Sequence, residues 1–202
     1  MRYTGPKAKK ARRLGMAFTS KDARILQRRA FPPGQHGQNR VRVSEYGMQL
    51  REKQKMKINY GVQEKQFRNY FDLALRQPGV TGDNLLRLLE SRLDNIVYRL
   101  GIAQTRAQAR QLVSHGFFSV NGKKVDIPSY SIRVGDTISV KENKRKAKII
   151  QNLSESLKSH KAQDWLEFNL KEISGKVISL PNKDLVENSI NTQLIVEHYS
   201  RN

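Results

Sequence analysis

Apolar positions recur at helical spacing in the middle of the chain. Between Ser44 and Gly61, Ser44 can cap a helix in which Tyr46 and Leu50 share one face and lysines and arginines crowd the rest. The next segment, residues 63–76, ends before Pro78 and has one apolar stripe, formed by Phe67, Tyr70, Phe71, Ala74 and Leu75. The spacing predicts two helices, the first with a basic face and the second with a buried stripe.

Two further helical segments follow. A leucine-rich stripe runs from Thr81 to Gly101 and fits either one helix or two. Residues 105–108, with the sequence TRAQ, have the form of a capping box, and Gly116 ends that helix. Arg106 and Arg110 are four residues apart, so we expect them to project together on the solvent side.

After Gly116 the hydrophobic period changes to two. Residues 117–120 and 123–125 flank Asn121-Gly122, the preferred pair for a type I′ turn, and 137–141 predicts a third strand of a small sheet. Beyond them we expect a helix over 149–157 and strand-like runs over 165–170 and 176–180. The closing run 194–199 is apolar enough to dock on a core.

Charge changes this picture. The 202 residues include 38 Lys or Arg and 18 Asp or Glu, for a formal net charge of +20. Residues 1–60 hold 16 of the cations and only three carboxylates. Because the stretch through Arg42 is also rich in glycine and proline, we expect it to be an extended basic arm. A surface this positive needs a polyanion, and nucleic acid is the first candidate, ahead of an anionic membrane.

Catalytic chemistry has few candidates in this sequence. There is no cysteine, no phosphate-binding glycine loop and no dinucleotide fingerprint, and the four histidines lie apart from one another. The absence of cysteine excludes disulfides and thiolate zinc sites. No apolar run is long enough to cross a membrane, and the N-terminus lacks an apolar signal region. We expect a non-enzymatic protein without cofactor or metal.

Several motifs carry a resemblance to a known family. RLDNIVYRLG at 92–101, the segment 105–116 and VNG at 120–122 resemble the S4 RNA-binding domain. That module also occurs in pseudouridine synthases, tyrosyl-tRNA synthetases and a heat-shock protein, so it indicates RNA binding without a particular task. The flanking motifs resemble bacterial-type small-subunit ribosomal protein S4, the uS4 family: PGQHG at 33–37, LREKQK at 50–55, TGDNLL at 81–86 and LIVE at 194–197. Many members hold zinc with four N-terminal cysteines; this chain is a cysteine-free form.

The resemblance implies an α+β fold in which a mainly helical domain, 44–91 with 142–202, carries an inserted S4 module, 92–141, consisting of helices and a small antiparallel sheet. Residues 1–43 would be a basic arm ordered by ribosomal RNA. The implied function is that of a primary 16S rRNA-binding protein, which nucleates assembly of the 30S body, contributes with S5 to translational accuracy and can repress its own mRNA. Implied partners are the junction in the 5′ domain of 16S rRNA, S5 and other 30S proteins, and messenger RNA where it enters. A cytoplasmic ribosome is expected, with an organellar one as the alternative.

Residues expected to contact rRNA are the cations and polar groups of the arm, of the first long helix and of the S4 module. In the arm they are Arg2, Tyr3, Lys7, Lys9, Lys10, Arg12, Arg13, Arg28, Arg29, His36 and Arg40. In the two helices after it they are Arg51, Lys53, Lys55, Lys57 and Arg68. In the module they are Arg99, Thr105, Arg106, Arg110, Gln111, His115, Asn121, Lys123 and Lys124.

Two other functions use the same features. An RNA-modifying enzyme with an S4 targeting module would need a catalytic domain, and the remaining residues are too few and too basic to form one. A free regulatory RNA or DNA binder would use the same basic surface. The ribosomal-type flanking motifs argue against regulation as the main role, so it stays as a secondary activity.

Overall fold

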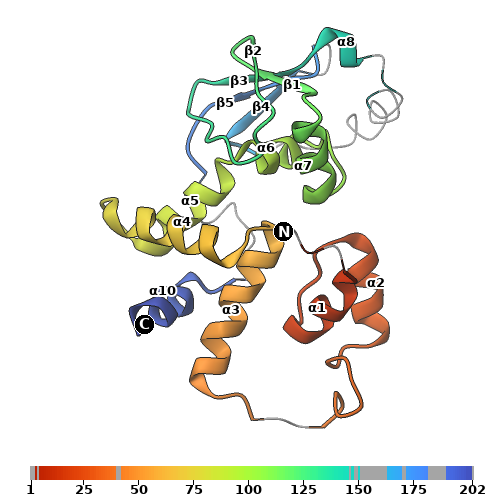
Figure 1. Ribbon diagram of the computed structural model, residues 1–202, viewed down its shortest axis with the longest axis vertical. Helices are drawn as coiled ribbons and strands as arrows, with labels where there is room; N and C mark the ends of the chain where they lie inside the picture. The colour runs from red at the N-terminus through yellow and green to blue at the C-terminus, as the bar shows by residue number, and fades with distance from the viewer. Residues whose placement is uncertain are drawn as a thin grey trace. The chain divides into compact units, whose positions relative to one another are not determined.

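The computed structural model describes residues 3, 5–39, 42–145, 147, 150, 163–169, 172–181 and 190–201 (Figure 1). The chain divides into two compact units. Unit 1 consists of Met1–Asp83 with Glu187–Asn202, and unit 2 of Asn84–Val186. The helix that the sequence predicts over 149–157 lies outside the described residues except for Ile150, which is helical and buried.

Unit 1 is helical. Its elements are α1 (Lys7–Leu14), α2 (Ser20–Arg28), α3 (Glu45–Asn59), α4 (Glu64–Arg76) and α10 (Thr192–Ser200). The two predicted central helices are confirmed as α3 and α4, and the Ser44 side chain accepts a hydrogen bond from the amide of Gly47 as an N-cap. The α4 stripe is buried at Phe67, Phe71 and Ala74, but Leu75 is exposed.

The N-terminal stretch differs from the expected extended arm, because it contains α1 and α2, which pack on each other. Gly15 adopts the left-handed conformation, with φ of 66°, and ends α1. Thr19 then caps α2, since its hydroxyl oxygen accepts a hydrogen bond from the amide of Asp22 at 3.3 Å. Gly15, one of the glycines that suggested loop structure, is therefore a helix end.

The C-terminal helix α10 packs against α3 within unit 1 (Figure 1). Ile195 is fully buried, and the Tyr199 ring lies 4.6 Å from that of Phe71, measured between centroids. Two hydrogen bonds fasten the ends of the contact. Gln49 donates to Glu197 at 3.2 Å, and the amide of Asn191 donates to Glu52 at 3.0 Å. This confirms that the closing apolar run docks on a core.

Unit 2 joins helices to an antiparallel sheet. The helical elements are α5 (Thr81–Glu90, which begins in unit 1), α6 (Leu93–Arg99), α7 (Arg106–Ser114) and the short α8 (Glu142–Arg145). The Thr81–Gly101 segment is two helices, because Arg92 is extended and pairs with Ser131 between them. The predicted cap of α7 is confirmed, since the hydroxyl of Thr105 accepts a hydrogen bond from the amide of Gln108.

The sheet in the described residues is five-stranded, in the order β2-β1-β3-β5-β4. Its strands are β1 (Phe118–Val120), β2 (Lys123–Lys124), β3 (Thr137–Val140), β4 (Leu166–Asn169) and β5 (Ser174–Val177). The predicted hairpin is confirmed, with φ positive at both Asn121 (49°) and Gly122 (78°), as a type I′ turn requires.

The two later strands differ from the expected domain organisation. β5 pairs with β3, so Ile138 lies opposite Gly175, and β4 pairs with β5 at the sheet edge. The expectation grouped 142–202 with 44–91, whereas in the structure only the last part of that range belongs to unit 1. Glycine at position 175 allows β5 to pack closely against the Leu100 side chain, because a Cβ there would come within 2.5 Å of a Leu100 methyl group.

One hydrophobic core joins α6 and α7 to the sheet. The two helices pack on each other (Figure 1). They supply Leu93, Ile96 and Leu112, which lie in one buried cluster with Ile138 of β3 and Trp165 beside β4. The combination of a helical unit with helices and a small antiparallel sheet confirms the α+β class.

Candidate RNA-binding surface

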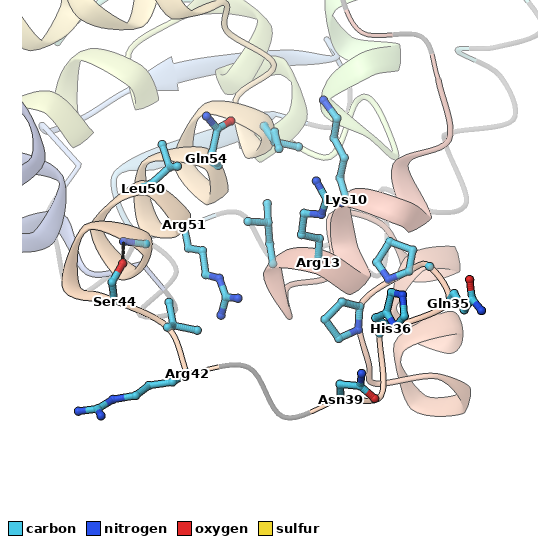
Figure 2. Close-up of a pocket in the computed structure, with 18 residues that line it drawn as sticks. Lys10, Arg13, Gln35, His36, Asn39, Arg42, Ser44, Leu50, Arg51 and Gln54 are labelled. Atoms are coloured by element: carbon cyan, nitrogen blue, oxygen red, sulfur yellow. Dashed lines mark hydrogen bonds between the residues drawn. The ribbon is translucent and has the colours of Figure 1, made fainter.

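A groove of about 1050 Å³ opens in unit 1 between α1, the turn at residues 31–39 and α3. We call it the basic groove, and its cationic lining residues are Lys10, Arg13, Arg42 and Arg51. No Asp or Glu is among the 18 residues that line it. Figure 2 shows Lys10 and Arg13 on α1, Arg51 on α3 and His36 on the turn, while the Arg42 side chain points outward.

The basic face expected on α3 is largely neutralised by carboxylates. Lys53 and Lys57 both donate to Glu64 of α4, at 2.9 Å and 2.8 Å, and Lys55 donates to Glu52 at 2.6 Å. Of the four α3 cations predicted to bind RNA, Arg51 is the exposed one. Sequence spacing placed these side chains on one helix but could not show that carboxylates from α3 and α4 reach them.

Glu64 is the centre of an ion-pair cluster with Lys53 and Lys57. Burial raises the pKa of Glu64, but hydrogen bonds from Lys57, Lys53 and Tyr199 more than offset it and bring the pKa down to about 2. Burial also raises the pKa of Tyr199, which donates its hydroxyl proton to Glu64 at 2.9 Å. The cluster therefore joins α3, α4 and α10, so Lys53 and Lys57 have a structural role in unit 1.

The predicted cations of α1 fall into different environments. Lys9 and Arg13 are exposed and Lys7 is half-buried. The Lys10 ammonium lies 3.4 Å from the centroid of the Tyr3 ring, and burial together with the charge of Lys57 lowers its pKa. Arg12, the neighbour of Arg13, donates to the backbone carbonyls of the 31–39 turn and does not line the groove.

Three other predicted arginines of unit 1 are not among the residues that line the groove. Arg28 and Arg29 are exposed at the end of α2, and Arg68 is exposed on α4. Arg2 and Arg40 lie outside the described residues. Arg42 lines the groove and was not predicted, although its place two residues before the Ser44 cap is a usable signal.

In unit 2, the three predicted arginines of the S4 module are engaged with α5 and α6. Arg99 donates twice to the fully buried Glu90, at 3.0 Å and 2.7 Å. Arg106 donates to Asn95 at 3.0 Å and stacks on Tyr98, with 4.5 Å from the guanidinium carbon to the ring centroid. These contacts correct the expectation that Arg106 projects into solvent.

Asp94 and Asn95 connect these arginines to one another. Asp94 forms a buried pair with Arg92 at 2.7 Å and lies 3.6 Å from Arg110 of α7, whose side chain is 29% exposed. The Asn95 amide donates to Glu90 at 2.6 Å while its oxygen accepts from Arg106. Arg106 and Arg110, both on α7, are thus held in fixed orientations by these α6 residues. Arg99 acts as the counterion of the buried Glu90 carboxylate.

The hairpin beside α7 presents further polar groups. Lys123 and Lys124 are exposed on β2, with Lys124 lying 3.6 Å from Asp126. Gln111 is exposed on α7, and His115 is exposed directly after the end of that helix. Asn121 has both ends of its amide occupied, donating to Asp136 at 2.8 Å and accepting from the amide of Thr137 at 2.9 Å. Thr105 uses its hydroxyl as the helix cap. Both residues shape the surface locally.

A hollow of about 660 Å³ in unit 2 was not predicted. Lys124, Lys141 and Arg145 line it, beside the hydroxyls of Ser119 and Ser139, which are hydrogen-bonded to each other at 2.9 Å. The basic run at 144–148, which follows β3 in the sequence, contributes Arg145 to this hollow.

Among the described residues, no group of three His, Cys, Asp or Glu side chains is placed to hold a metal ion. No helix in that part of the chain is both long and apolar enough to cross a membrane.

Comparison with known proteins gives two family matches. Residues 2–90 match the model for the ribosomal protein S4/S9 N-terminal domain, and residues 91–138 match the S4 domain. Among similar proteins are those named small ribosomal subunit protein uS4 from Roseiflexus castenholzii (56% identical), Chloroflexus aurantiacus (55%) and Desulforamulus reducens (52%). Each alignment covers 99% of this chain and 99% of the relative.

Proposed function

The chain belongs to the uS4 family of small-subunit ribosomal proteins. We propose that it binds the 5′ domain junction of 16S rRNA through the basic groove of unit 1 and through a second surface in unit 2. We call the latter the α7–β2 surface and assign to it Arg106, Arg110, Gln111, His115, Lys123 and Lys124. As a member of that family it is a structural component of the small ribosomal subunit, associated with ribosomal RNA, and not an enzyme.

The observation that carries the proposal is the basic groove, because none of its described lining residues is a carboxylate that would oppose its cations. Arg13 and Arg51 come from two helices of one compact unit, so their charges are held at a concave surface. Each phosphate that such a cation neutralises releases condensed counterions, which contributes affinity without reading sequence. An RNA backbone that enters the groove would meet Lys10, Arg13 and Arg51.

The α7–β2 surface supports the same function, but its arginines are held in place by partners on α6. Arg106 and Arg110 are oriented by their contacts with Asn95 and Asp94 of α6, and Gln111, His115 and Lys123 are exposed. Preoriented arginines lose little side-chain entropy on binding, which suits recognition of a shaped RNA backbone. We assign Arg99, Thr105 and Asn121 to support of this surface.

From binding to ribosomal RNA we propose four further roles and a location. Early binding to the 5′ domain junction would nucleate the 30S body, and S5 would be a neighbour with which the protein affects decoding accuracy. Messenger RNA would pass near the protein where it enters the subunit, and the same cations could repress translation of the protein's own mRNA. We place the protein in a cytoplasmic ribosome.

A salt titration of RNA binding tests the proposal. The full chain should bind a transcript of the 16S 5′ domain, and Arg13→Gln and Arg51→Gln should each lower the slope of log K against log salt by about 0.7 to 0.9. Arg76→Gln, at an exposed arginine of α4 outside both surfaces, is the matched control and should leave the slope unchanged. Equal slopes for all four proteins would remove the groove from the interface.

A further inference from the structure

Arg12 and Arg13 are neighbours in sequence, but their side chains have different surroundings. Arg13 is exposed and lines the basic groove. The Arg12 guanidinium donates from Nε to the carbonyl of Phe31 at 3.0 Å and from Nη2 to the carbonyl of Pro32 at 3.2 Å. Its central carbon also lies 4.9 Å from the centroid of the Phe31 ring. One side chain thus ties α1 to a turn some 20 residues later.

The turn that Arg12 holds is tightly folded. The amide of Gly37 donates to the carbonyl of Gly34 at 3.2 Å, and that of Asn39 donates to His36 at 3.1 Å. A Cβ at Gly37 would lie 2.0 Å from the carbonyl oxygen of Pro32, so only glycine fits there. The oxygen that confines Gly37 is therefore the same one that Arg12 binds.

This turn forms one wall of the basic groove, to which it contributes Pro33, Gln35 and His36 (Figure 2). Residues 31–39 contain no Lys or Arg. A change in the position of the turn would therefore alter the shape of the groove and its neutral contacts without removing a lysine or arginine from it.

We propose that Arg12 is a positioning residue, which fixes the 31–39 turn against α1 and so shapes the basic groove, and that it does not contact RNA phosphates itself. Arginine suits this role because its planar fork presents Nε and Nη2 to adjacent carbonyls at once, which a lysine ammonium cannot reproduce. The binding part of the inference rests on the proposed function, whereas the positioning part concerns the free protein. The expected RNA contact at Arg12 is thereby replaced.

Two measurements on the full chain test the proposal with Arg12→Gln, Arg12→Lys and Arg13→Gln. In the free protein, amide hydrogen exchange at Gly37 and Asn39 should become at least about fivefold faster in both Arg12 variants, because local opening becomes easier, while α3 and α4 keep their protection. In Arg13→Gln the turn should exchange as in the wild type.

In titrations with the 5′ domain transcript, Arg12→Gln should bind about tenfold more weakly at every salt concentration, as when one charge-assisted hydrogen bond is lost. Its salt slope should equal that of the wild type, whereas Arg13→Gln should lower the slope by about 0.7 to 0.9. A slope reduced to the same extent by Arg12→Gln would make Arg12 a phosphate contact and overturn the proposal. Unchanged affinity would also overturn it.

Two results of the exchange measurement would overturn the positioning role without reference to RNA. One is unchanged exchange at Gly37 and Asn39 in both Arg12 variants. The other is faster exchange throughout α3 and α4 in both, which would make Arg12 a general stabiliser of unit 1. If the wild-type chain failed to bind the transcript, the proposed function would fall, and exchange would still decide the positioning role.

Discussion

Replacement of Arg99 by methionine should destabilise unit 2, because Arg99 is the counterion of a buried carboxylate. Glu90 is fully buried and accepts hydrogen bonds from Arg99 at 3.0 Å and 2.7 Å and from Asn95 at 2.6 Å. The Arg99 side chain is itself only 10% exposed, so little water screens the pair. Methionine retains most of the apolar stem and removes the charge that compensates Glu90.

The size of the effect follows from the burial. Loss of one partner of a buried ion pair costs about 3 to 5 kcal/mol, because the other charge stays in the interior uncompensated. With an m-value of about 2 kcal/mol/M for unfolding of a domain of this size, the urea midpoint should fall by about 1.5 to 2.5 M. The double variant Glu90→Leu with Arg99→Met should recover most of this loss, since it removes both charges.

Fluorescence of Trp165 is the assay for this prediction. Trp165 is the single tryptophan of the chain and is 1% exposed within the core cluster of unit 2, so its emission reports unfolding of that unit. Arg87→Met, at an exposed site on α5, is the matched control and should change the stability by less than about 0.5 kcal/mol. An Arg99→Met midpoint equal to that of the control would refute the assignment of Arg99 as a buried counterion.

Two other predictions concern unit 1 and the hairpin. The pKa of Glu64 is about 2 in the folded chain and about 4.5 when unperturbed, so its contribution to stability is present above pH 4.5 and is lost as the pH falls toward 2. Thermal melts followed by circular dichroism should show a steeper loss over that range for the wild type than for Glu64→Gln, and parallel curves would contradict the ion-pair cluster. Asn121→Ala should cost about 1 to 2 kcal/mol in Trp165-monitored urea unfolding, because the turn loses its hydrogen bonds to Asp136 and Thr137; a midpoint equal to that of the wild type would count against this role.

Helix ends with their own signals were predictable from the sequence. Ser44 and Thr105 cap α3 and α7 as expected, and Asn121-Gly122 forms the expected turn, because these structures depend on neighbouring residues. The same local rules failed in the N-terminal stretch, where glycines such as Gly15 indicated loop. The structure has two short helices there, and Gly15 ends the first of them. Those helices pack on each other, and stabilisation by such packing cannot be predicted from the composition of one segment.

The basic surface was predicted less well than the fold. A count of cations treats Arg12 and Arg13, or Arg51 and Lys53, as equivalent, yet in each pair only one side chain is exposed at the groove. Lys53, Lys55, Lys57 and Arg99 each meet a carboxylate within 3 Å. Glu64 comes from the following helix and Glu90 from the end of α5, so only the folded chain reveals these pairs.

The sequence by itself determined the positions of α3, α4, α7 and the hairpin, the excess of positive charge and the family, because periodicity, caps, turn residues and motifs are local or additive properties. The tertiary structure alone decided which cations face the groove, which neutralise buried carboxylates, and that β4 and β5 complete the sheet begun by β1 to β3. These outcomes depend on contacts between residues far apart in the chain, and the free energy of such contacts is set by burial and geometry that no single segment contains.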